Sequence, residues 1–234
     1  MEIKKARAFI PTQRKCWGDT TILDSIPPHI NIHMANENKE PLSKIYNQAI
    51  DKALKDDINC LILVHDDVIL EEDPIPKLEK LFDEYDVVGV AGASKIELKS
   101  PALWHLMGGG FGGGHLHGCV QHLIQKNGID GVGGYYKKPV PTNFGPYPHR
   151  VVMIDGVFMA LNRKAMETMR FDEDNPSPFH FYDLSYSLSC HLAGLKVGVG
   201  DILITHESPG LREFTEDWKN GENYFLNKYA GQNK

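Results

Sequence analysis

Two adjacent carboxylates end an apolar segment of this sequence. In the stretch INCLILVHDDVIL, residues 58–70, the run CLILV is followed at once by His65, Asp66 and Asp67. Neighbouring carboxylates at the mouth of a buried strand repel each other and lose hydration, which costs free energy unless a positive group lies there. A divalent cation that prefers oxygen ligands, such as Mg²⁺ or Mn²⁺, would turn this repulsion into binding. A solvated turn explains the same residues equally well.

Three further side chains stand where chemistry is feasible. His206 ends the apolar segment DILITHES, Asp183 opens an amphipathic helix pattern, and Asp155 precedes Gly156 within the apolar segment VVMIDGVFMA. Each has a structural alternative. A lone His at a strand end is often structural, an Asp at a helix start is commonly an N-cap, and a buried Asp needs a hydrogen-bond partner. The residues alone leave these roles open.

Residues 100–150 are rich in glycine, with the runs MGGGFGGGHLHG and GVGG. The segment is too long for a plain connection, and such segments are typically functional or disordered. We expect a flexible insertion that acts as a mobile lid, in preference to a metal site at His115 and His117. It does not match a phosphate-binding loop, because no Gly-Lys-Ser/Thr follows the glycines.

The elements that must position these residues alternate between strand and helix. Residues 6–11 and 29–34 have strand patterns, residues 40–57 repeat apolar side chains at helical spacing, and residues 59–64 form an apolar strand. A strand–helix–strand unit of this length predicts parallel strands with a right-handed crossover. Further helices are expected at 77–85, 164–169 and 179–194, and strands at 86–94, 150–162 and 196–208. We predict one α/β domain whose ligands bind beyond the carboxyl ends of the strands.

Composition sets limits on partners and compartment. The formal net charge of −6 gives no bulk attraction for nucleic acid, which we do not expect as a partner. The four cysteines are widely spread without a C-x-x-C pair, which is typical of reduced thiols in the cytosol. No apolar signal region opens the sequence, and no apolar run approaches the ~18 residues of a membrane span. We therefore expect a cytoplasmic protein without a transmembrane segment.

In their order and spacing, these motifs resemble those of a GT-A-fold glycosyltransferase of the broad family 2 type, in its small prokaryotic and phage branch. The motifs are YNQAIDKAL, LILVHDDVIL, DGVFMA, FDE, FHFYD, a Gly-x-x-Val before HESPG, and the tail EDWKNGENYFLNKY. The resemblance covers most of the chain outside residues 100–150. It implies a Rossmann-like mixed, mainly parallel sheet flanked by helices over residues 1–234, with the insertion near residues 100–150.

The resemblance also implies a function, namely metal-assisted transfer of a sugar from a nucleotide-diphosphate sugar, expected to be a UDP-sugar, to a hydroxyl of a carbohydrate or other acceptor. His65, Asp66 and Asp67 take the place of the family's Asp-x-Asp, with His65 where the first Asp would be. Asp67 and His206 would bind Mn²⁺ or Mg²⁺. Asp183 would be the general base of an inverting reaction, and Asp155 would lie near the sugar. The donor-binding residues would be Pro11, Thr12, Asn36, Glu37, Ser43, Asn47, His65, Asp66 and Gly156.

Other readings stay open. A retaining transferase of the same fold would use Asp155 in place of Asp183 near the sugar. A sugar nucleotidyltransferase should carry a Gly-rich, Arg-containing loop after the first strand, and FIPTQRKCWG is poor in glycine. A metal-dependent phosphohydrolase would need more ligands than the sequence offers. A nucleotide- or glycan-binding module without turnover would keep the fold and lose the chemistry.

Overall fold

The computed structural model describes residues 1–15, 22–96, 114–126, 136–207 and 214–229. Its centre is a seven-stranded sheet in the order β2-β1-β3-β11-β5-β12-β9. Parallel pairs join β1 to β2 and β3, and β5 to β12, whereas β11 and β9 run antiparallel to their neighbours. The strands are β1 (Ala6–Pro11), β2 (Asn31–Ala35), β3 (Cys60–Val64), β5 (Val87–Gly89), β9 (His149–Val151), β11 (Phe158–Asn162) and β12 (Val197–Val199).

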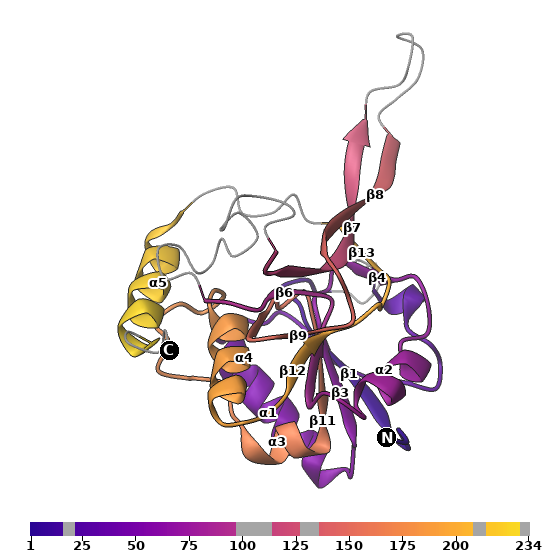
Figure 1. Cartoon of the computed structure of the whole chain (residues 1–234), viewed down its shortest axis with the longest axis horizontal. Coiled ribbons are helices and arrows are strands. Elements are labelled where there is room, and N and C mark those ends of the chain that lie inside the picture. Colours follow the sequence, from indigo (N-terminus) through magenta and orange to yellow (C-terminus); the bar gives the residue numbers. More distant parts are fainter. Residues whose placement is uncertain (16–21, 97–113, 127–135, 208–213, 230–234) are drawn as a thin grey trace.

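Helices cover both faces of this sheet because its strands are apolar on both sides. In β3, Cys60, Ile62 and Val64 belong to one core cluster, while Leu61 and Leu63 belong to the other. Figure 1 shows α1, α3 and α4 on one side of the sheet and α2 on the other. The helices are α1 (Leu42–Lys55), α2 (Ile75–Leu81), α3 (Arg163–Thr168), α4 (Tyr182–Leu192) and α5 (Glu216–Tyr229). The structure is therefore the predicted mixed α/β sheet flanked by helices.

A second sheet has the order β10-β6-β7-β13-β4, and β8 pairs with β7 at its side. The long antiparallel pair β7–β8 stands out from the rest of the molecule (Figure 1). The strands are β4 (Val68–Leu70), β6 (Ala91–Ala93), β7 (Leu116–Lys126), β8 (Tyr136–Gly145), β10 (Met153–Ile154) and β13 (Ile204–His206). The sequence patterns predicted neither β7 nor β8. Residues 97–113 and 127–135 lie outside the described residues, so the flexible lid stays a prediction.

The polar tail of the sequence forms helix α5, which the sequence analysis did not predict. Trp218, Phe225 and Tyr229 are buried along one side of α5. The Tyr229 hydroxyl donates a 3.0 Å hydrogen bond to the carbonyl oxygen of Ser185 in α4, which fastens the tail to the domain. Among the described helices, none combines the length and the apolar character that crossing a membrane would require.

Candidate active site

One edge of the central sheet gathers the predicted site residues. The parallel strands β1 and β3 both end there, which places Thr12 and His65 at the same edge. Strand β11 runs the opposite way, so the segment that precedes it reaches that edge too, and the His65 amide donates a 3.3 Å hydrogen bond to the carbonyl oxygen of Val157. The short antiparallel pair β4–β13 then brings His206 opposite Val68. The sheet topology alone therefore assembles residues as distant in the sequence as Thr12 and His206.

A cavity of about 430 Å³ opens at this edge. Its volume falls in the range of about 300–1,000 Å³ that is usual for small-molecule sites. Residues from the loops after β1, β2 and β3 line it, together with one residue of α1 and one of the segment before α4. They are Pro11, Thr12, Gln13, Arg14, Asn38, Leu42, His65, Asp66, Asp67 and Phe179.

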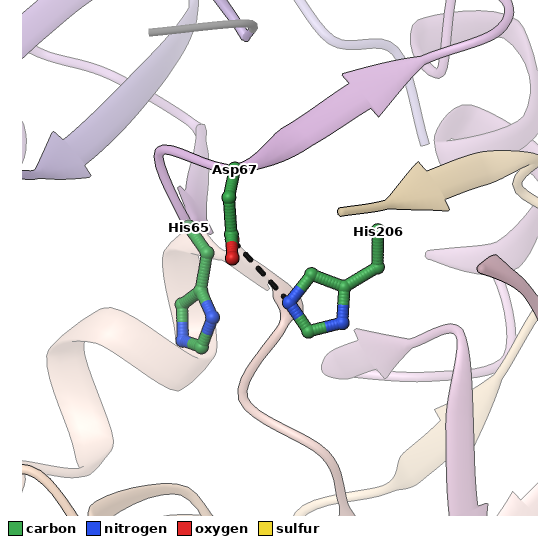
Figure 2. A group of neighbouring side chains, drawn as sticks. All are labelled: His65, Asp67 and His206. Atoms are coloured by element: carbon green, nitrogen blue, oxygen red, sulfur yellow. Dashed lines mark ion pairs between the residues drawn. The ribbon is translucent and has the colours of Figure 1, made fainter. Parts of the chain in front are cut away.

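His65, Asp67 and His206 form a compact cluster beside the cavity (Figure 2). Each offers one potential ligand atom, and these three atoms lie within 4.8 Å of one another. The Nε2 atom of His206 lies 3.3 Å from Oδ1 of Asp67. That nitrogen is buried and has no partner that meets hydrogen-bond geometry. Buried polar atoms normally have such a partner, so an unsatisfied imidazole nitrogen beside a carboxylate fits a site for a cation.

Asp67 and His206 stabilise each other's charged forms. Burial opposes the charged form of His206, but the neighbouring Asp67 carboxylate outweighs it and raises the His206 pKa above its ordinary value. Burial also opposes ionisation of Asp67, and the contact with His206 overcomes it and lowers the Asp67 pKa. Burial lowers the pKa of His65 and favours its neutral form. Asp67 and His65 are thus shifted toward the ionised carboxylate and the neutral imidazole that bind a metal, whereas a cation would have to displace the proton that Asp67 favours on His206.

Asp66 points to different partners from Asp67. Its Oδ2 atom accepts a 2.5 Å hydrogen bond from the Thr12 hydroxyl and lies 3.6 Å from Nε of Arg14. The Thr12 hydroxyl oxygen in turn accepts a 3.1 Å hydrogen bond from the backbone N–H of Arg14. The two carboxylates of the sequence motif thus have different partners: Asp67 faces the histidines, and Asp66 faces the loop after β1.

Asp183 lies in the first turn of α4, and the N-cap position belongs to Phe181, with a positive φ of 64°. The carboxylate of Asp183 accepts a 2.7 Å hydrogen bond from the Gly156 amide and a 2.9 Å hydrogen bond from the Leu184 amide. Burial, with repulsion from Asp155, nevertheless raises the Asp183 pKa to about 7. The N-cap alternative for Asp183 is therefore wrong, because the N-cap is Phe181 and the helix begins at Tyr182; the Asp183 carboxylate links the first-turn amide of Leu184 to the amide of Gly156.

Asp155 and Gly156 sit immediately before β11. The carboxylate of Asp155 accepts a 2.9 Å hydrogen bond from the amide of Val157, so it closes the turn into the strand. The negative charge of Asp155 raises the pKa of Asp183 and also favours the charged form of His206. Neither residue lines the cavity described above, and neither does Asp183. The hydroxyl of Tyr182 joins the two regions, because it lies 2.9 Å from Nε2 of His65.

Besides Gly156, four residues expected near the donor do not line the cavity. Asn36 and Glu37 are exposed in the turn after β2, where their neighbour Asn38 faces the cavity instead. Ser43 is buried in the first turn of α1. The Asn47 side chain donates to the carbonyl oxygen of Phe171 (3.0 Å) and accepts from the Phe171 amide (2.8 Å). The structure therefore gives Asn47 a bridging position between α1 and the segment before α4.

The sequence analysis missed several residues of the site. Arg14 and Gln13 follow Thr12 in the loop after β1, and a cation directly after the first predicted strand was the signal that could have found Arg14. Phe179 and Tyr182 belong to the motif FHFYD, in which only Asp183 was assigned a role. His115 and His117 lie outside the metal-ligand cluster of the described residues. The His117 ring stacks on His149 with centroids 3.7 Å apart.

Comparison with known proteins finds a matching family, a similar curated protein and a solved structure of similar fold. A family described as "Glycosyltransferase like family" matches residues 25–229. The streptomycin biosynthesis protein StrF of Streptomyces griseus is 26% identical over 190 residues, which are 79% of this chain and 59% of that protein. The chain thus spans well under two-thirds of that relative. The crystal structure of A197 from STIV has a TM-score of 0.50 and 14% identity, covering 91% of this chain and 98% of that one, and is similar in fold.

Proposed function

Because this chain belongs to the glycosyltransferase-like family, we propose that it transfers a sugar from a nucleotide-diphosphate sugar, a UDP-sugar, to an acceptor hydroxyl with the help of a divalent metal and with inversion at the anomeric carbon. The observation that carries the proposal is the cluster of His65, Asp67 and His206 on the edge of a cavity at the carboxyl ends of parallel strands. In open α/β sheets, nucleotides bind at this edge.

The donor would occupy the cavity between the loops after β1 and β3. Pro11, Thr12, Asn38 and Asp66 all line it, and the last three give polar groups for a ribose and a base. Arg14 is the cationic side chain of the lining and suits an anionic ligand. Leu42 and Phe179 add apolar surface at the α1 side. Such a mixture of apolar wall and few polar groups is typical of a small-molecule site.

Asp67 and His206 would hold the metal, since a carboxylate oxygen and an unsatisfied imidazole nitrogen face each other at 3.3 Å. A bound Mn²⁺ or Mg²⁺ would neutralise the charge that develops on the leaving diphosphate. Two further carboxylates, Asp66 and Asp155, lie in the same region. Asp66 lies 3.6 Å from Arg14, and Asp155 accepts a hydrogen bond from a backbone amide, so each already has a partner outside the cluster of His65, Asp67 and His206.

Asp183 would be the general base. The acceptor oxygen attacks the anomeric carbon, the bond from that carbon to the diphosphate breaks, and the hydroxyl proton passes to the Asp183 carboxylate. A base with a pKa of about 7 is well matched to this task at neutral pH. The two backbone amides of Gly156 and Leu184 fix the carboxylate in one orientation. Fixed orientation lowers the entropy cost of reaching the transition state.

A panel of nucleotide-sugars tests the proposal. Purified protein is incubated with each donor and Mn²⁺, with and without simple glycoside acceptors, and the release of nucleoside diphosphate is measured. We expect release with a UDP-sugar and a drop of about 10²–10⁴-fold in Asp183→Asn, whose donor affinity stays unchanged. Asp172→Asn, on the segment before α4, is the matched control. Product NMR would report the anomeric configuration.

The outcomes separate the alternatives. Retention of configuration with an active Asp183→Asn variant would replace Asp183 by Asp155 as the carboxylate near the sugar. Tight binding of UDP without release from any donor would indicate a nucleotide-binding module. Pyrophosphate exchange between UTP and a sugar phosphate would indicate a nucleotidyltransferase. Absence of binding to every uridine and guanosine nucleotide would contradict the proposed function itself.

A further inference from the structure

His65 stands where the resemblance to family 2 transferases places an aspartate. The contacts of the His65 ring therefore indicate which role an imidazole has at this position. Its Nε2 atom lies 2.9 Å from the hydroxyl oxygen of Tyr182. In Figure 2 the other ring nitrogen is on the side of Asp67 and His206. The His65 and His206 rings meet edge to face with centroids 5.9 Å apart. One nitrogen is therefore engaged inside the protein while the other faces the cluster.

The hydrogen bonds of Tyr182 are compatible with the tautomer that a metal needs. The Tyr182 hydroxyl can donate to the carbonyl oxygen of Gly156, which lies 3.4 Å away and can only accept. In that arrangement the hydroxyl oxygen accepts from Nε2–H of His65, 2.9 Å away. A neutral imidazole with its hydrogen on Nε2 has a lone pair on Nδ1. Metal-binding histidines generally donate their second N–H to such a fixed partner, which orients the ring.

The packing around Tyr182 leaves its hydroxyl little freedom. The residue is 4% exposed and its ring lies against Tyr46 and Phe171, with centroids 5.4 and 6.4 Å away. Gly156 sits so close that a Cβ there would stand 2.2 Å from the tyrosine hydroxyl oxygen. A buried aromatic ring enclosed in this way holds one rotamer, and so it holds His65 in one orientation.

We propose that His65 is the third protein ligand of the metal site, through Nδ1, and that Tyr182 is the positioning residue that presents it. The ion would then be held by two imidazoles and one carboxylate. This donor set disfavours Mg²⁺, which demands oxygen ligands, and favours ions that accept imidazole, in the order Mg²⁺ below Mn²⁺ below Co²⁺. The inference deepens the metal part of the proposed function, but metal binding can be measured without any transfer reaction.

Metal titration of the full chain tests the inference directly. After removal of bound metal with a chelator, Mg²⁺, Mn²⁺ and Co²⁺ are titrated by calorimetry, and the visible absorption of Co²⁺ reports its coordination. We expect Co²⁺ to bind most tightly. His65→Ala should lose about 10–100-fold in Co²⁺ affinity and change the absorption spectrum, and Tyr182→Phe should lose affinity in the same range while the protein stays folded.

His65→Asp restores the residue that the family pattern expects, and it sharpens the test. In this variant the affinity for Co²⁺ should fall while the affinity for Mg²⁺ rises, because an oxygen donor replaces a nitrogen donor. A mere loss of folding would lower both affinities together. Two controls remove comparable groups elsewhere: His29→Gln removes an exposed histidine, and Tyr186→Phe removes a buried hydroxyl from the same helix as Tyr182. Both should bind Co²⁺ as the unmodified chain does.

The inference and the proposed function can fail separately. If His65→Ala keeps both the Co²⁺ affinity and the Co²⁺ spectrum of the unmodified chain, His65 is not a ligand, whatever the donor assays give. If Tyr182→Phe binds Co²⁺ unchanged, Tyr182 does not position His65. If no ion binds the unmodified chain, the metal site itself is wrong. If the metal binds as expected but no nucleotide-sugar is turned over, the metal site stands and the transfer proposal fails.

Discussion

The backbone amide of Gly156 donates a 2.7 Å hydrogen bond to the carboxylate of Asp183. The same glycine carries the carbonyl oxygen that accepts from the hydroxyl of Tyr182, which also contacts His65. One glycine thus lies between the proposed base and the metal-ligand cluster. Only a residue without a side chain fits there, because a Cβ would stand 2.2 Å from the Tyr182 hydroxyl oxygen and 3.0 Å from Cβ of Asp183.

Gly156→Ala should therefore disturb both halves of the site at once. Overpacking of this kind costs typically about 1–3 kcal/mol of unfolding free energy, which urea denaturation would measure. Adding Tyr182→Leu to the same chain removes the group that the new methyl meets, so the double variant should be more stable than the sum of the two single changes predicts. Strict additivity of the two changes would contradict the close contact.

The raised pKa of Asp183 predicts a pH-dependent stability. This carboxyl titrates near 3.8 in the unfolded chain and near 7 in the folded one, so the folded chain binds more protons between these values. The contribution of this raised pKa to the unfolding free energy is fully present below about pH 3.8, and it is lost as the pH rises through about 7. Asp183→Asn has no such titration, and its unfolding free energy relative to the unmodified chain should increase with pH across this window.

Denaturant unfolding at a series of pH values between about 4 and 8 would measure this difference. The asparagine oxygen can accept only one of the two backbone amides, and its NH₂ group then faces the other, which adds a loss of stability that does not depend on pH. The change of the difference with pH therefore reports the titration. A variant that is less stable than the unmodified chain by the same amount at every pH would show that Asp183 is ionised in the folded protein throughout.

A substitution at Asn47 distinguishes a structural role of this residue from the donor-binding role that the family resemblance implied. Its amide nitrogen donates to the Phe171 carbonyl and to Glu173, and its oxygen accepts from the Phe171 amide. Asn47→Ala leaves these buried groups unpaired and should lower the unfolding free energy by about 1–3 kcal/mol. The dissociation constant for UDP with Mn²⁺, measured by calorimetry below the melting temperature, should stay unchanged. Weaker UDP binding at full stability would restore the donor-binding role.

Local patterns predicted the central part of the fold. The apolar run before His65 requires a buried strand, and a carboxylate at its end can only be at the sheet edge. His206 ends a similar run, but its role as a metal ligand was implied only by the family resemblance and stays a prediction. Asn47 was misplaced because its partners are 124 residues away, and helical spacing says nothing about such distant contacts. Tyr182 contacts His65 and Arg14 contacts Asp66, and such contacts between distant segments leave no periodic pattern in the sequence.

Strands β7 and β8 were missed for a different reason. Pro139 and Pro141 interrupt the strand pattern of β8, and proline normally argues against a strand. Within the part of the chain that the structure describes, β8 pairs only with β7, which makes it an edge strand, where proline is tolerated because its missing N–H can face away from the partner. Helix α5 was hidden by its polar composition and by Gly221, since only a narrow stripe of large side chains is buried.

Arg14 should contribute to donor binding through Asp66. Removing the arginine side chain, in Arg14→Met, deletes a cation from the cavity wall and leaves the Asp66 carboxylate facing an anionic ligand without its partner. Removing the charge of that carboxylate, in Asp66→Asn, deletes the group that orients Arg14. We expect Arg14→Met to weaken UDP binding by about 1.5–3 kcal/mol, which is the usual value for a hydrogen bond to a charged group.

A double-mutant cycle distinguishes cooperation from independent contacts. If Asp66 acts by holding Arg14, the loss in the double variant should be smaller than the sum of the two single losses, with a coupling of at least about 0.5 kcal/mol. Lys15→Met, on the next residue along the same loop, is the control for a general loss of positive charge, because Lys15 is exposed and does not line the cavity. Calorimetry with UDP and Mn²⁺ at two salt concentrations would measure all four dissociation constants. Additive losses would mean that Asp66 does not position Arg14. An equal loss in Lys15→Met would mean that only the overall charge of the loop attracts the nucleotide.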